Sequence, residues 1–124
     1  MDRRYANVVA VLTDYFDGLY ESDTARLARV FHPQAQYVCA SDGSLLQLTM
    51  AEYFPIVDRR ASPASRGEPR RDAILSIEFA GSVTAFARAE CSIGTKDFTD
   101  FLTLVFVEGR WQIIAKVFHF ELRE

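Results

Sequence analysis

Cysteine is scarce in this chain, which has only Cys39 and Cys91 among its 124 residues. Two cysteines in an acidic chain without an export signal favour reduced thiols, so we expect a cytoplasmic protein. The sequence contains no C-x-x-C pair and no histidine–cysteine spacing typical of a metal site. It also has no glycine-rich nucleotide fingerprint and no nucleophile elbow. We therefore expect neither a metal nor a cofactor.

Positive charge is also limited, with 14 Lys and Arg against 17 Asp and Glu, a net charge of −3 and a pI of about 5.4. Without a basic field to neutralise phosphates, nucleic acid is not an expected partner. The arginines between residues 59 and 71 are diluted by Glu68, proline and serine, which is typical of a solvated loop. No apolar run is long enough to cross a bilayer, so a membrane partner is not expected either.

Apolar residues make up 49% of the chain, enough for the core of one domain spanning 1–124. Helical spacing and capping signals occur first, and alternating strand patterns follow. The expected helices cover 2–21, 24–31 and a segment starting at the 49–52 capping box. The expected strands cover 35–40, 45–48, 71–79, 83–93, 96–107 and 110–121, with a mobile loop at 59–70. This order predicts an α+β fold, with helices on one face of a curved, mostly antiparallel sheet.

The last two strands flank Glu108-Gly109, a two-residue connection typical of a tight hairpin. If this hairpin is regular, Asp100 faces Val117 and Phe98 faces His119. Asp100 and His119 then lie diagonally on an otherwise apolar face. A carboxylate in line with a core face is costly unless a partner or a cavity accommodates it. Asp100 is therefore the best indication of a site in this sequence.

The two sheet faces have different expected roles. The face of Asp100 also carries a row of alanines, which leaves room for a closely packed helix or for a cavity, and packing is the more common outcome. Lys116 falls on the opposite face, where we expect it to be paired or solvated. That face is too apolar for a monomer to leave wet, so we expect a homodimer formed by sheet-on-sheet packing. Its apolar residues are Phe86, Phe101, Val105, Ile114, Phe118 and Phe120.

The chain resembles the nuclear transport factor 2-like, or SnoaL-like, superfamily, and within it the group called "putative lumazine-binding". The residues that carry the resemblance are Y-F-D-G-L-Y-E-S-D at 15–23, F-H-P-Q-A at 31–35, D-G at 42–43 and the segment 98–119, so it covers essentially the whole chain. It implies a cone-shaped α+β barrel of three N-terminal helices and a curved sheet, a pocket between them, and usually a homodimer. The superfamily includes isomerases, cyclases, dehydratases, binding proteins and scaffolds, so the fold does not define an activity.

Three residues are candidates for catalysis. Asp100 could act as a general acid, a general base or a hydrogen-bond donor to a carbonyl, or it could be a structural carboxylate. His119 could shuttle a proton beside it, or be a strand-end histidine satisfied by Asp100 or water. In the superfamily's ketosteroid isomerases, a tyrosine on the first helix and a protonated aspartate on the hairpin form an oxyanion hole, and Tyr15 and Asp100 align with these positions. The catalytic base of those enzymes aligns at or near Cys39, and a thiol is a poor substitute for that carboxylate.

Four residues are candidates for ligand contact. Tyr37 and Cys39 share one strand face, so both or neither line a cavity. His32 precedes Pro33 at a helix C-terminus, where the dipole favours a structural role, with pocket lining as the alternative. Trp111 is more often a core plug than a stacking platform.

Three functions remain open from the sequence. The first is a small-molecule-binding protein with a pocket around Asp100 and an aromatic or polycyclic, oxygen-bearing ligand. The second is a cofactor-free isomerase, dehydratase or cyclase that uses Asp100 with His119 or Tyr15. The third is a dimeric interaction or scaffold module with a vestigial pocket. A buried carboxylate beside a void would argue against the third, because a scaffold has no use for so costly a group.

Overall fold

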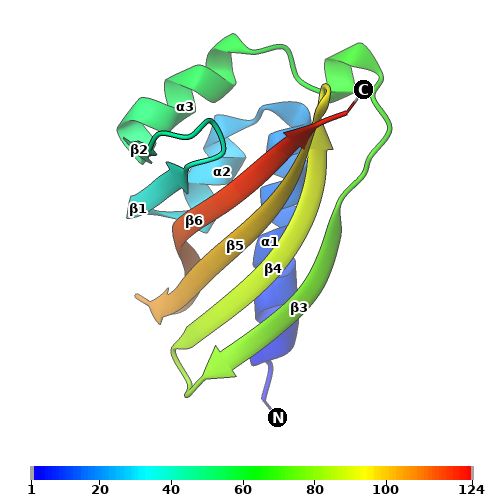
Figure 1. The fold of residues 1–124 in the computed structure, drawn as a ribbon. Helices are drawn as coiled ribbons and strands as arrows, with labels where there is room; N and C mark the ends of the chain where they lie inside the picture. The colour runs from blue at the N-terminus through cyan, green and yellow to red at the C-terminus, as the bar shows by residue number, and fades with distance from the viewer. Residues whose placement is uncertain (1, 124) are drawn as a thin grey trace.

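The computed structural model describes residues 2–123, which form three helices and a six-stranded sheet (Figure 1). The helices are α1 Arg4–Glu21, α2 Thr24–Val30 and α3 Met50–Arg59, with a short 3-10 turn, η1, at Ala64–Arg66. The strands are β1 Phe31–Cys39, β2 Leu46–Thr49, β3 Ala73–Ala80, β4 Thr84–Ile93, β5 Lys96–Val107 and β6 Arg110–Leu122. The predicted α+β class is confirmed.

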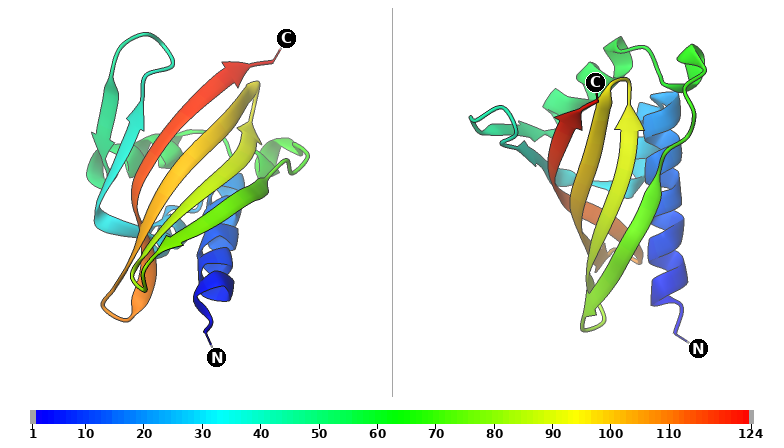
Figure 2. Two further views of the ribbon diagram at one scale, coloured as in Figure 1. Left: turned by 60° about the horizontal axis from the view of Figure 1, so that its bottom comes forward. Right: turned by 45° about the vertical axis from the view of Figure 1, so that its right-hand side comes forward.

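The sheet has the strand order β2-β1-β6-β5-β4-β3, and only the β1–β6 pair is parallel. It curves strongly around α1 but does not close, because β2 and β3 are its two edges (Figure 2). The expected cone is therefore an open one. No helix within residues 2–123 is long and apolar enough to span a membrane.

Local chemistry explains the helix boundaries. Ser22 adopts the left-handed conformation that ends α1, and the Asp23 side chain accepts the backbone N–H of Arg26 to begin α2. Thr49 and Glu52 form the predicted capping box of α3. Between α2 and α3, the chain passes from α2 directly into β1. This strand begins at Phe31, whereas the predicted strand began at residue 35.

The segment 59–70, predicted as a mobile loop, has defined anchors. It contains η1, and the Tyr20 hydroxyl donates a hydrogen bond to the Glu68 carbonyl at 2.6 Å. The Glu68 carboxylate in turn accepts the backbone N–H of Gly94 at 2.9 Å. These contacts attach the segment to α1 and to the β4–β5 turn.

The β5–β6 hairpin begins as predicted and then departs from the regular register. Glu108 and Gly109 both have positive φ, as a two-residue turn of the primed type requires. Further along, Leu104 pairs with Ile113 but Thr103 pairs with Ala115. The extra residue, Ile114, forms a β-bulge, which shifts the alternation by one residue.

The bulge reverses the predicted faces of the second half of β6. Lys116 pairs with Leu102 and Phe118 pairs with Asp100, so Lys116 and Phe118 are buried on the inner face. His119 moves to the outer face and pairs with Thr99. The predicted pairs Asp100–Val117 and Phe98–His119 are therefore wrong, as is the placement of Lys116 on the opposite face, paired or solvated.

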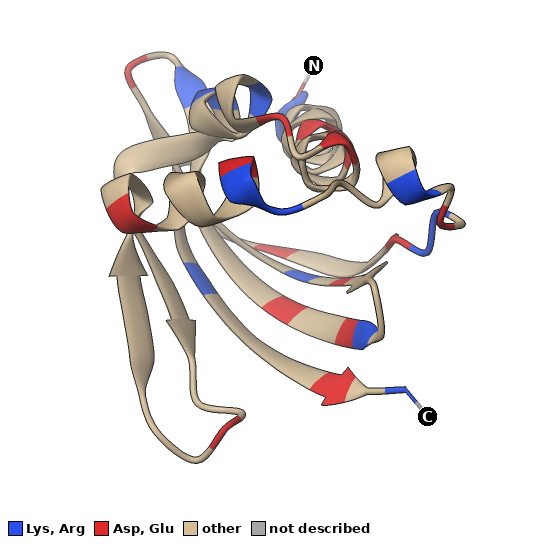
Figure 3. Ribbon diagram, turned by 90° about the horizontal axis from the view of Figure 1, so that it is seen from above, with Lys and Arg blue, Asp and Glu red and all other residues tan. Residues whose placement is uncertain are grey.

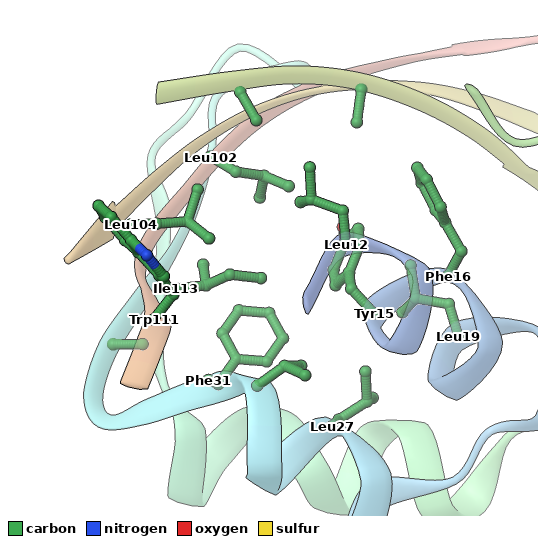
Figure 4. Close-up of a cluster of buried hydrophobic side chains, with 14 of the residues drawn as sticks. Leu12, Tyr15, Phe16, Leu19, Leu27, Phe31, Leu102, Leu104, Trp111 and Ile113 are labelled. Carbon is green, nitrogen blue, oxygen red and sulfur yellow. The ribbon is translucent and has the colours of Figure 1, made fainter. Parts of the chain in front are cut away.

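The core lies between α1 and the concave face of the sheet. In Figure 4 the side chains of Leu12, Tyr15 and Phe16 of α1 lie beneath the sheet, in the same buried cluster as Leu102 and Leu104 of β5 and Ile113 of β6. The row of alanines, Ala85, Ala87 and Ala89, is fully buried in the same cluster. Close packing therefore accounts for the small side chains.

The outer sheet face is less apolar than predicted, because Phe118 and Phe120 belong to the other face. Phe86 and Phe101 remain on it with ring centroids 5.6 Å apart, and the Arg88 guanidinium lies 5.2 Å above the Phe101 ring. Beyond β6, strands β1 and β2 contain no Lys, Arg, Asp or Glu and are tan in Figure 3.

Candidate functional site

Helix α1 and strand β5 bring Tyr15 and Asp100 into direct contact in the interior. The Tyr15 hydroxyl donates a hydrogen bond of 2.5 Å to Asp100 Oδ2, and both residues are fully buried. The second carboxylate oxygen, Oδ1, is buried with no hydrogen-bond partner in the described part of the chain. Such an oxygen costs free energy unless another group satisfies it. The predicted Tyr15–Asp100 pair thus forms, and it keeps one acceptor free.

Lys116 joins this pair because the β6 bulge turns it inward. Its side chain is 4% exposed, and its ammonium lies among aromatic faces. The ring centroids lie 5.0–5.9 Å from Nζ, in Phe118, Tyr15, Tyr37, Tyr53 and Phe98. Aromatic faces attract a cation, and the attraction strengthens when water is excluded. The result is a buried ammonium beside a buried carboxylate, both on the inner face.

Lys116, Tyr15 and Cys91 hold their protons at neutral pH. Burial alone would lower the pKa of Lys116, but the nearby Asp100 carboxylate raises it above the ordinary lysine value. Burial, together with the Asp100 charge, raises the pKa of Tyr15 well above the ordinary phenol value. The same two causes raise the pKa of Cys91 to about 12. Neither a thiolate nucleophile at Cys91 nor a free amine at Lys116 is therefore available near neutral pH.

A pocket of about 600 Å³ opens at one end of the sheet, next to this group. Its walls are the β1–β2 hairpin, the C-terminal end of α3, the β4–β5 turn and the end of β6. Tyr37 and Cys39 both line it, as the strand alternation requires. Phe98 and Phe118 line it as well, and these two rings and Tyr37 also surround the Lys116 ammonium. One layer of aromatic side chains thus separates the pocket from Lys116 and Asp100.

The other predicted site residues lie elsewhere. His119 is exposed, and its Nδ1 is 2.5 Å from the hydroxyl of Ser41, so it is not a partner of Asp100. His32 lies in β1 rather than at a helix end, and its Nδ1 accepts the backbone N–H of Gln34 at 3.0 Å. Trp111 is buried in the core, with its ring centroid 5.6 Å from that of Phe106.

Residues 2–123 contain no cluster of three or more His, Cys, Asp or Glu side chains able to hold a metal ion. The polar groups that the site brings together are the Tyr15 phenol, the Asp100 carboxylate and the Lys116 ammonium. Together these three groups can donate to, accept from and electrostatically stabilise an oxygen-bearing molecule.

A sequence signal for Lys116 exists in β6. In the first half of β6 the apolar residues Trp111 and Ile113 have odd numbers, and in the second half the apolar residues Phe118 and Phe120 have even numbers. The change of parity falls at the adjacent pair Ile113–Ile114, where one inserted residue keeps both halves apolar on the inner face. This change of parity in the sequence predicts that Lys116 lies on the inner face.

Comparison with known proteins supports a family assignment. The family model described as "Putative lumazine-binding" matches residues 3–119. A curated protein from Cladobotryum sp., named "Aldolase FrzH", is 27% identical over 117 residues, which cover 93% of this chain and 90% of that protein.

Solved structures share the fold over nearly the full length. An NTF2-like protein of unknown function from Silicibacter pomeroyi is 26% identical with a TM-score of 0.85, and the match covers 96% of this chain and 97% of that one. A second, from Shewanella baltica, is 28% identical with a TM-score of 0.85 and coverage of 96% and 94%.

Proposed function

Because the chain belongs to the "putative lumazine-binding" family of NTF2-like proteins, we propose that it binds a small, flat, oxygen-bearing organic molecule in the pocket beside Lys116. The pocket volume of about 600 Å³ falls in the range of small-molecule sites. Its lining combines aromatic rings with a few polar groups, which is the usual composition of such sites.

The observation that carries this proposal is the polar group immediately behind the aromatic wall. A structural core gains little from a buried ammonium and carboxylate, since apolar residues of similar volume often serve as well or better. Here both charges are present, and the Asp100 Oδ1 atom has no partner within residues 2–123. A ligand hydroxyl that passes the aromatic layer would find both a cation and an acceptor, which gives the costly arrangement a use.

Filling the pocket should reduce ligand affinity. Leu46 lines the pocket and is 46% exposed, whereas Leu75 is 49% exposed and lies on β3, away from it. We expect Leu46→Trp to weaken binding of 2-naphthol or lumazine about fivefold or more, because over-filling a packed site costs about 1 kcal/mol or more. Leu75→Trp should bind as the wild type does. Amide shifts of ¹⁵N-labelled protein report both affinity and location.

Two outcomes of that titration would count against pocket binding. Shifts that map to the far end of the sheet, around Val30 and Phe106, would place the ligand elsewhere. Absence of binding by either probe and by related bicyclic phenols and ketones would favour an interaction module instead.

A second function is favoured by the buried group itself and by the relative named as an aldolase. We infer that the chain could catalyse proton removal next to a carbonyl, without a cofactor. The aromatic layer would have to open for this reaction, after which Asp100 Oδ1 would take the proton and the Lys116 ammonium would stabilise the enolate oxygen that forms. A Schiff base at Lys116 is disfavoured, because the raised pKa of Lys116 keeps the amine protonated.

This enzyme function predicts exchange of an acidic C–H bond with solvent. We expect the wild-type protein to speed deuterium incorporation next to the carbonyl of 2-tetralone in D₂O, and Asp100→Asn to slow it about 100-fold or more, as loss of a general base does. Proton NMR of the recovered ketone measures the rate. Equal rates with both proteins, each shown to be folded by circular dichroism, would leave only the binding function.

A further inference from the structure

Three cationic side chains and one acidic side chain line the pocket: Arg60, Arg66, Lys96 and Asp42. Asp42 is exposed in the β1–β2 turn. Arg66 already has a partner, since its Nε lies 2.8 Å from the Glu68 carboxylate. The Lys96 ammonium lies 4.5 Å from the centroid of the Phe120 ring. Arg60 differs from these two cations because two of its guanidinium nitrogens have no hydrogen-bond partner among the described residues.

Arg60 follows the last residue of α3, and its guanidinium is partly withdrawn from solvent. Its Nε and Nη2 atoms are both covered from water, and neither has a hydrogen-bond partner among residues 2–123, so the guanidinium has to turn toward the pocket before this edge can bind a ligand. These two nitrogens form one edge of the guanidinium plane, with parallel N–H bonds. That edge matches the two oxygens of a carboxylate in a bidentate pair.

The surroundings of Arg60 connect it to the polar group deeper inside. Burial raises the pKa of Tyr37, while the positive charges of Lys116 and Arg60 both act to lower it. The Tyr37 ring centroid lies 5.3 Å from the Lys116 ammonium, and Tyr37 lines the pocket together with Arg60. A flat molecule against Tyr37 would place one end toward Arg60 and the other toward Lys116.

We propose that the ligand carries a carboxylate, which the Nε–Nη2 edge of Arg60 binds while an apolar ring packs against Tyr37, Phe98 and Phe118. This inference rests on the proposed pocket binding and specifies its ligand class. A planar monoanion suits the site better than a phosphate, because α3 points its C-terminal, partially negative end toward the pocket. A single arginine edge also offers two donors, the number a carboxylate takes in a bidentate pair.

The test compares 2-naphthoate with 2-naphthamide, which share one bicyclic ring system and differ in charge. We expect wild-type protein to bind the carboxylate at least about tenfold more tightly, since a charge-assisted bidentate pair is worth that much. In Arg60→Gln the two affinities should become equal, and Arg60→Lys, which keeps the charge but loses the edge, should give an intermediate ratio. Arg59→Gln is the matched control, because Arg59 is an exposed neighbour outside the pocket lining.

The outcomes separate the inference from the proposal on which it rests. If both probes bind the pocket equally in the wild type, or if Arg60→Gln retains the preference, the carboxylate assignment is overturned and pocket binding stands. If neither probe shifts the amide resonances of the pocket, both are overturned. A preference that disappears in Arg60→Gln and persists in Arg59→Gln supports the inference.

Discussion

Lys116→Met should destabilise the protein by about 1–3 kcal/mol, because it removes the nearby cation that offsets the buried Asp100 carboxylate without a direct ion-pair contact. Methionine keeps much of the lysine stem, so the loss reflects charge more than volume. Asp100→Asn should cost a similar amount, because it leaves the ammonium among its aromatic rings without a counter-charge. Urea unfolding at pH 7 measures both changes.

The double variant Asp100→Asn with Lys116→Met distinguishes charge coupling from simple packing loss. Since it contains no uncompensated charge, it should lose less stability than the sum of the single variants, with a coupling of about 1–3 kcal/mol. If the single variants do not fold and the double variant does, the coupling is equally established. Strict additivity would mean that the two charges are independent, and the account of the site would then be wrong.

Stability should fall steeply at alkaline pH. The pKa values of Tyr15, Tyr37, Cys91 and Lys116 are all higher in the folded protein than their ordinary values. Each group therefore binds its proton more tightly when folded. Its stabilising contribution is complete below the unfolded pKa and is lost as the pH rises toward the folded pKa. The loss begins near pH 8.5 for the thiol and near pH 10 for the phenols and the ammonium.

The variant Tyr15→Phe isolates one of these contributions. Above pH 10 each such group should lower the free energy of unfolding by about 1.4 kcal/mol per pH unit. In Tyr15→Phe the free energy of unfolding should decrease less steeply with pH, by the contribution of one group. The variant also loses stability at pH 7, because it lacks the hydrogen bond to Asp100. Tyr5→Phe is the control, because the Tyr5 ring is exposed. Identical slopes for Tyr15→Phe and the wild type between pH 10 and 11 would contradict the burial account.

The fold could be predicted from the sequence because its signals are local. The capping box at Thr49, the turn at Glu108-Gly109 and the alternation of β4 each depend on neighbouring residues, and each is confirmed. The helix–sheet order then leaves few arrangements open. The resemblance to NTF2-like proteins agrees with the family match and the solved structures.

The candidate site could be predicted only in part, because it depends on long-range register. Tyr15 and Asp100 meet, as the resemblance to the superfamily's ketosteroid isomerases implied. Because of one inserted residue, Ile114, Lys116 lies on the inner face and His119 on the outer face, the reverse of the prediction. A single-residue slip reverses every side chain beyond it, so a small local error had a large effect on the predicted chemistry. The Arg60 edge was also missed, because the lack of a partner is visible only in three dimensions.

The most direct test is a crystal structure of the wild-type protein, purified without added ligand and then soaked with 2-naphthol. The account predicts an organic molecule in the pocket, with its ring against Tyr37, Phe98 and Phe118, and its oxygen directed toward Lys116. A molecule that copurifies with the protein and occupies the same place would serve equally well. A pocket filled by its own side chains, with Asp100 and Lys116 satisfied entirely by protein groups, would contradict the account.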